Sequence, residues 1–237
     1  MRYLLYPKKT LYYKKTIIKA RNWQLPFWQQ ERISIMKKYE KLLRTSRILP
    51  IKCPENMEEL ETMLSAIMKT PLRVVEITLR NGFALDAIKY IKQNYPEIIV
   101  GAGTVVNSSL LNQALKNGAD FCVSPGLDFE LLNEAKNKNM PFLPGCSNPS
   151  EILMAQKFGL NIVKFFPAEI SGGVEALKLY EGAFSDMLFL PTGGITIENA
   201  KDYLKLKNVV ACGGSFMIGA SANETCNKIL SCLEGVL

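Results

Sequence analysis

The sequence has no histidine among its 237 residues, and this absence restricts its chemistry more than any other feature of the composition. Imidazole is the usual general base near neutral pH and the commonest metal ligand in proteins. Ser-His-Asp catalysis and zinc sites built from histidine are therefore excluded. Any acid–base chemistry has to come from carboxylates, lysines, tyrosines, cysteines or water.

Paired cysteines and long apolar runs are also missing. None of the six cysteines forms a C-x-x-C pair, and most lie in or beside apolar segments, so we expect reduced thiols rather than disulfides. No stretch approaches the ~18 uninterrupted apolar residues of a membrane span. The first thirty residues lack a compact signal-peptide core. The sequence therefore predicts a cytoplasmic protein with no membrane partner.

Positive charge is concentrated at the start of the chain. Residues 1–47 hold thirteen Lys or Arg and two Glu, net +11, which leaves 16 basic and 20 acidic residues, net −4, for residues 48–237. Basic pairs alternate with aromatic residues in "KKTLYYKKTIIKARNW", a pattern that nucleic-acid-binding segments share. The same composition fits a solvated extension, which is the interpretation we favour. A nucleic-acid-binding arm on a scaffold domain is the alternative.

Short apolar runs alternate with longer segments of helical period from Ile48 onward. The predicted strands are residues 48–52, 73–79, 98–102, 120–124, 140–144, 161–166, 187–191 and 208–213. Predicted helices are residues 55–69, 84–94, 107–118, 128–139, 148–159 and 196–207. Several open with a capping residue, Asn107, Asp128 or Thr196, and two end at a glycine, Gly118 or Gly159.

Eight such units, spaced by roughly 20 to 25 residues, favour an α/β fold of the (β/α)8 TIM-barrel type over an open sheet. We expect residues 46–237 to form this barrel. Residues 1–45 would then supply a basic N-terminal extension and an N-terminal helix. The helix, predicted over residues 31–45, would close the bottom of the barrel or lie against it.

The second predicted strand, "VVEITLR", carries polar side chains on one face. Helices cover the outside of a barrel, so the apolar face should point outward and Glu76, Thr78 and Arg80 should point inward. Desolvating these groups costs several kcal/mol unless they bind one another or a ligand. Glu76 and Arg80 lie ~13 Å apart along the strand, which favours separate functions at different depths. A structural Glu–Arg pair is the alternative.

The sixth predicted strand, "NIVKFF", contains a lysine among apolar residues. Lys164 shares a face with Ile162 and Phe166, whereas Val163 and Phe165 take the other face. If the latter pair packs under helices, Lys164 projects into the barrel beside Glu76. A partly dehydrated amine favours its neutral form, which can attack a ketone and form an imine. A lysine that reaches out to solvent is the alternative.

Two glycine doublets follow the last two predicted strands. "PTGGI" spans residues 191–195, and "CGGSF" spans residues 212–216, where Ser215 adds a hydroxyl. Barrels of this class bind phosphate at these positions through backbone amides. Glycines also serve turns, so each doublet alone is weak evidence.

Seven stretches together carry a family resemblance over about residues 46–237: "RVVEITLRN", "IIVGAGTVVN", "FCVSPGL", "FLPGCSNPSE", "VKFFPAE", "LPTGGI" and "CGGSF". In these stretches the chain resembles the family of 2-keto-3-deoxy-6-phosphogluconate (KDPG) aldolases, which also act as 4-hydroxy-2-oxoglutarate (KHG) aldolases. The resemblance implies a trimeric class I aldolase, without metal or other cofactor, that releases pyruvate and glyceraldehyde 3-phosphate from its phosphorylated keto-acid substrate. Two alternatives remain: an aldolase that acts on the galactonate epimer of this substrate, and a phosphate-binding barrel enzyme that forms no covalent intermediate.

The resemblance also implies a role for individual residues. Lys164 would be the Schiff-base lysine, and Glu76 would be the general acid and base, working through water. The implied substrate contacts are Arg80 and Thr104 for the pyruvate carboxylate, Pro125 and Phe166 for the pocket wall, and Gly193, Gly194 and Ser215 for the phosphate.

Overall fold

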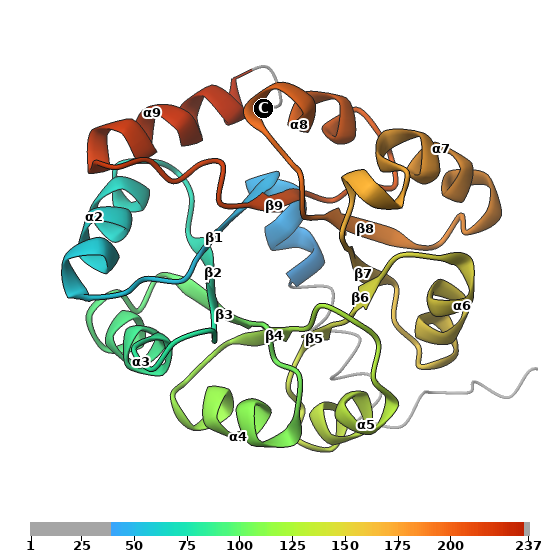
Figure 1. Cartoon of the computed structure of the whole chain (residues 1–237), viewed down its shortest axis with the longest axis horizontal. Helices are drawn as coiled ribbons and strands as arrows, with labels where there is room; N and C mark the ends of the chain where they lie inside the picture. Colours follow the sequence, from blue (N-terminus) through green and yellow to red (C-terminus); the bar gives the residue numbers. More distant parts are fainter. Residues whose placement is uncertain (1–38, 235–237) are drawn as a thin grey trace, which may run out of the picture.

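The structure, a computed structural model, describes residues 39–234. Residues 1–38, with most of the predicted basic extension and the start of the predicted leading helix, lie outside the described part. Short apolar segments of the described chain form parallel strands in two sheets, which together curl into a ring with helices on its outside (Figure 1). This is an α/β, TIM-like architecture.

Parallel strands make up the ring. Within the described residues they are β1 Ile48–Lys52, β2 Val74–Thr78, β3 Ile99–Gly103, β4 Phe121–Val123, β5 Phe142–Leu143, β6 Gly145–Cys146, β7 Ile162–Phe165, β8 Leu188–Pro191 and β9 Cys212–Gly214. One sheet has the order β5-β4-β3-β2-β1-β9 and the other β6-β7-β8. Only Pro144 separates β5 from β6, and single bridges, Phe189 to Val209 and Thr192 to Gly213, join β8 to the β9 segment.

Helices follow the strands along the chain and cover the outside of the ring (Figure 1). They are α2 Met57–Met68, α3 Ala84–Asn94, α4 Ser108–Lys116, α5 Phe129–Asn137, α6 Pro149–Lys157, α7 Gly173–Ala183, α8 Ile197–Leu204 and α9 Ala222–Leu233, with a 3-10 turn, η1, at Glu169–Ser171. The predicted caps Asn107, Asp128 and Thr196 are confirmed, because each side chain accepts a hydrogen bond from the first turn of its helix.

Two predicted strands differ from the observed ones. Of the run at residues 140–144 only β5 is a strand, and β6 continues it beyond the predicted end, after an interruption at Pro144, which has no N–H to donate to a neighbouring strand. The run at residues 208–213 pairs regularly only from Cys212 onward, since Val209 makes a single bridge. Gly213 and Gly214 therefore lie within β9 rather than after it, and the prediction that this doublet follows its strand is wrong.

The predicted alternation of side chains along "NIVKFF" is confirmed. Val163 and Phe165 are fully buried in a cluster with Ile152 of α6 and Leu177 of α7, so they face the covering helices. Ile162 belongs to a separate cluster, together with Leu190 of β8. Lys164 shares the face of Ile162 and therefore points to the inside of the ring.

Residues 39–46 are helical and lie at the N-terminal ends of the strands. The Tyr39 hydroxyl donates to the carbonyl of Asp120, just before β4, at 2.6 Å. The Asn161 amide, just before β7, donates to Glu40 at 3.1 Å. This helix is the blue one seen through the ring in Figure 1. Its described part therefore closes the bottom of the ring, which leaves the C-terminal ends of the strands open for a site.

None of the helices within residues 39–234 has the length and hydrophobicity needed to cross a bilayer.

Candidate active site

A buried carboxylate and a buried amine face each other inside the ring. Glu76 of β2 is 0% exposed and Lys164 of β7 is 7% exposed, although 87 residues separate them in the sequence. Lys164 Nζ lies 3.7 Å from Glu76 Oε1. This is an ion-pair distance but longer than the 2.7–3.2 Å typical of a hydrogen bond. The structure thus brings together the two residues to which the sequence assigned catalysis.

Neither carboxylate oxygen of Glu76 has a hydrogen-bond partner within the described residues. Buried polar atoms in folded proteins nearly always have partners, and unpaired ones are costly. A carboxylate kept in this state is free to bond a water or a substrate hydroxyl that enters from the open end. This is the arrangement that a general acid and base requires.

Burial raises the pKa of Glu76, and the nearby charges of Lys164 and then Arg80 oppose this effect. Desolvation is the largest of these causes, because the carboxyl group lies in the closed interior. A carboxyl with a raised pKa holds its proton closer to neutral pH than an exposed glutamate does. It is therefore better matched to both accepting and returning a proton.

Gly103 makes the space that the Glu76 side chain occupies, and it was not among the predicted site residues. Glu76 and Gly103 lie on the neighbouring strands β2 and β3. A Cβ at residue 103 would lie 2.8 Å from Glu76 Cδ and closer still to Oε1. Only glycine permits the observed position of the carboxylate. The available signal was the two glycines in "GAG" on a strand beside a buried glutamate.

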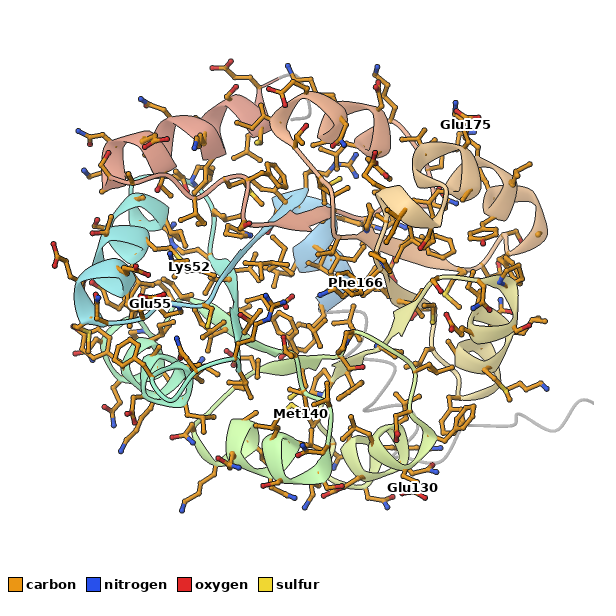
Figure 2. All side chains as sticks on the ribbon, viewed as in Figure 1. Lys52, Glu55, Glu130, Met140, Phe166 and Glu175 are labelled. Atoms are coloured by element: carbon orange, nitrogen blue, oxygen red, sulfur yellow. The ribbon has the colours of Figure 1, made fainter. Side chains whose placement is uncertain are left out.

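Phe166 lies between the lysine and the glycine loop that follows β8. Lys164 Nζ is 5.0 Å from the centroid of the Phe166 ring. A Cβ at Gly193 would lie 3.2 Å from the same ring. Figure 2 shows Phe166 inside the ring of strands, whereas Glu130 and Glu175 lie on the outer helices. The aromatic side chain therefore forms part of the interior wall beside the amine.

Arg80 and Thr104 meet at the C-terminal ends of β2 and β3. Arg80 Nε donates to Thr104 Oγ1 at 3.3 Å. Arg80 is exposed while Glu76 is fully buried, and no ion pair joins the two among residues 39–234. The predicted difference in depth is confirmed. Thr104 has a positive φ of 60°, which a β-branched residue rarely adopts and which occurs most often where function fixes the backbone.

The loop after β8 turns two backbone amides to one side. The carbonyls of Thr192 and Gly193 accept hydrogen bonds from the N–H groups of Ala168 at 2.9 Å and Glu169 at 3.2 Å. In a trans peptide the N–H points opposite to the C=O, so the N–H groups of Gly193 and Gly194 both face away from residues 168 and 169. Positive φ values of 93° and 81° permit this conformation. Successive amides on one side form an anion-binding concavity.

Ser215 and Pro125 also lie at the C-terminal end of the sheet. Ser215 is exposed directly after β9, the strand that the Thr192–Gly213 bridge joins to the loop. Pro125 is exposed in the loop after β4, and its carbonyl lies where a side chain at Gly145 of β6 would be. All nine candidate residues therefore lie on the inside of the ring or on loops at one end of it.

No group of three or more Cys, Asp, Glu or His residues is arranged to hold a metal ion within residues 39–234.

We predict that Gly103→Ala lowers the rate of any reaction that needs Glu76. The added methyl group must displace the carboxylate, and a displacement of ~1 Å is enough to cost ~10²-fold in rate. The rate of deuterium exchange into the methyl group of pyruvate, followed by proton NMR, measures this. Gly82→Ala is the control, because a Cβ there meets nothing within 4 Å. An exchange rate in Gly103→Ala equal to that of the control would contradict the prediction.

The chain matches one family of enzymes along most of its length. The sequence pattern of the family described as "Aldolase: KDPG and KHG aldolase" matches residues 39–232. The KHG/KDPG aldolase of Escherichia coli strain K12 is 43% identical over 185 residues, which are 78% of this chain and 87% of that protein. The 2-dehydro-3-deoxy-phosphogluconate aldolase of Dickeya dadantii is 41% identical over 186 residues, with the same shares of the two chains.

A solved structure has the same fold. The crystal structure of KDPG aldolase from Legionella pneumophila, with pyruvate captured at low pH as a covalent carbinolamine intermediate, superposes with a TM-score of 0.77 at 31% identity. The match covers 82% of this chain and 96% of that one.

Proposed function

The chain belongs to the KDPG and KHG aldolase family and is an aldolase, a carbon–carbon lyase, and we propose that it works as a class I enzyme through Lys164. The observation that carries this proposal is the buried Lys164–Glu76 pair, in which neither carboxylate oxygen is hydrogen-bonded by another of residues 39–234. Covalent capture of pyruvate in the Legionella pneumophila relative supports the covalent route. The substrate we propose is KDPG, as the names of the curated relatives suggest.

In the first half of the proposed reaction, Lys164 gives a proton to Glu76, and its neutral Nζ attacks the C2 ketone of KDPG. Glu76 returns this proton to the carbinolamine hydroxyl, which leaves as water, and an iminium ion results. Glu76 accepts the proton of the C4 hydroxyl, directly or through a water molecule. The electron pair of the C3–C4 bond then moves into the iminium, which becomes an enamine, and glyceraldehyde 3-phosphate leaves. The bond that breaks joins C4 to C3, the neighbour of the carbon that Lys164 holds, so its electron pair can pass into the iminium.

The second half releases pyruvate. Glu76 returns its proton to C3 of the enamine, and water hydrolyses the iminium that results. This step consumes the water that the first half released, so the net reaction is cleavage of KDPG into two products. One carboxyl group serves in both directions because its raised pKa suits it to hold the proton between the two steps.

The remaining candidate residues are proposed to bind the two ends of the substrate. Arg80 and Thr104 would hold the pyruvate carboxylate, since they meet at the open end of the ring near the buried pair. The amides of Gly193 and Gly194, with the hydroxyl of Ser215, would bind the phosphate. Phe166 and Pro125 would line the pocket between these ends.

We also propose the finer architecture that the sequence predicted. Counting β5 and β6 as one strand interrupted at Pro144 gives the eight strands of a (β/α)8 barrel, with the barrel domain starting near residue 46. A homotrimer is proposed from the family resemblance, and the 86% and 75% exposure of Ile170 and Leu179 supports contact with another copy. Six free cysteines support a reducing, cytoplasmic location.

We predict that borohydride treatment in the presence of pyruvate attaches an adduct of pyruvate mass to Lys164. Peptide mass spectrometry would locate it. Lys164→Ala should lose about three or more orders of magnitude in kcat, because the covalent route disappears. Lys164→Arg is the matched variant, since it keeps the positive charge but is not a nucleophile. Substantial activity in Lys164→Arg, with no adduct in the wild type, would instead favour a purely electrostatic lysine.

Glu76→Gln is expected to slow pyruvate deuterium exchange by ~10² to 10⁴-fold while pyruvate still binds. The wild-type rate should fall as the pH drops through the pKa of Glu76, because the proton-accepting carboxylate is then lost. Burial raises that pKa, so the midpoint should lie above ~4.3, the ordinary value for glutamate. A pH–rate profile measures it, and an acid limb at or below the ordinary value would argue against this role.

Pyruvate release, coupled to lactate dehydrogenase, should be fastest with KDPG among three substrates. The galactonate epimer differs at one hydroxyl, and KHG lacks the phosphate that the glycine loop would bind. One lost polar contact typically lowers kcat/KM about tenfold or more. A higher kcat/KM for the epimer or for KHG would reassign the substrate and leave the lysine chemistry in place.

A further inference from the structure

The segment that follows Lys164 packs against the proposed phosphate loop. Residues 166–169 come directly after β7, and two of their N–H groups bond to the carbonyls of Thr192 and Gly193. The missing side chain of Gly193 leaves room for the Phe166 ring and for Pro167 Cα, which would lie 3.2 Å and 3.3 Å from a Cβ there. The conformation of the phosphate loop therefore depends on this segment.

Gly194 is held by side chains on both sides. A Cβ at Gly194 would lie only 2.5 Å from Glu169 Cγ and 2.7 Å from its Cβ, so the stem of Glu169 lies directly against the Gly194 backbone. On the other side, Asn199 Nδ2 donates to the Gly194 carbonyl at 3.0 Å. Asn199 belongs to α8, the helix that starts just after the loop.

The carboxylate of Glu169 is turned away from the loop by a tyrosine of α8, the helix that also carries Asn199. The hydroxyl of Tyr203, which is 0% exposed on α8, donates a hydrogen bond to Glu169 Oε1. Gly173, the first residue of α7, also adjoins this bond, since a Cβ there would lie 3.2 Å from the Tyr203 hydroxyl. Burial first, and the bond to Glu169 second, raise the pKa of Tyr203, so the hydroxyl remains a donor at neutral pH.

We propose that Glu169 and Tyr203 are positioning residues for the phosphate of the substrate, an inference that rests on the proposed function. Their hydrogen bond fixes the rotamer of Glu169, whose stem supports Gly194 and with it the two amides of the loop. The same bond directs a carboxylate toward α7 and α8, away from a site that takes a dianion, where it would repel the ligand. Neither residue contacts Lys164 or Glu76 among the described hydrogen bonds and ion pairs.

Tyr203→Phe tests the proposal by removing only the hydroxyl. We expect KM for KDPG to rise about five- to tenfold, the size of a typical lost hydrogen bond, with kcat within about twofold. Binding of inorganic phosphate, measured by phosphorus NMR titration, should weaken by a similar factor. Deuterium exchange into pyruvate, which involves no phosphate, should keep its wild-type rate.

Variants of Glu169 separate the hydrogen bond from a general loss of packing. Glu169→Ala should reproduce the effect of Tyr203→Phe. Glu169→Gln retains an acceptor oxygen and a stem of the same length, so phosphate affinity should stay within about twofold of the wild type. Tyr95→Phe is the matched control: it also removes a tyrosine hydroxyl bonded to a carboxylate, that of Glu61 at 2.7 Å, but between the outer helices α2 and α3.

The two readouts keep this proposal separate from the proposed function. Unchanged phosphate affinity in Tyr203→Phe and Glu169→Ala, or an equal loss of phosphate affinity and pyruvate exchange, would overturn the positioning role. If the wild type neither exchanges pyruvate protons nor cleaves KDPG, the proposed function fails. Phosphate titration then still decides whether these two residues position the loop.

Discussion

The desolvation of two opposite charges is the constraint on which the site depends. Glu76 and Lys164 lie in the interior of the ring, where each alone would be an uncompensated buried charge, at a cost of ~3–5 kcal/mol. Their separation of 3.7 Å is short enough for attraction but too long to satisfy the carboxylate oxygens. The fold therefore tolerates a pair that is compensated in charge and unsatisfied in hydrogen bonding, which is the condition for chemistry with a third partner.

The curled parallel sheet makes this pair possible. Because every strand runs in the same direction, residues far apart in sequence meet inside the ring and the polar loops gather at one end. Contacts that stabilise the opposite end involve other residues, such as Tyr39 on the carbonyl of Asp120. Stability at the bottom and reactivity at the open end are in this way assigned to different parts of the chain.

Much of this arrangement was predictable from the sequence, since the period of two in "VVEITLR" and "NIVKFF" fixes which side chains face inward. The partnership of Glu76 with Gly103 was not, because it depends on how β2 and β3 align across the sheet. Helix α7 was not among the predicted helices, because the glycines at its start and near its end weaken the helical pattern of the sequence. The contact of Glu169 with Tyr203 joins two elements 34 residues apart and leaves no local signal.

One short segment connects the two functions of the site. The strand that carries Lys164 continues into residues 166–169, which bond to the carbonyls of the loop proposed to bind phosphate. The backbone of this segment therefore helps to set the spacing between the amine and the Gly193 and Gly194 amides, together with Asn199 of α8. If the loop binds phosphate as proposed, a substrate whose ketone reaches Lys164 needs its phosphate at a matching distance, so the segment that places the amine would also select the length of the acid.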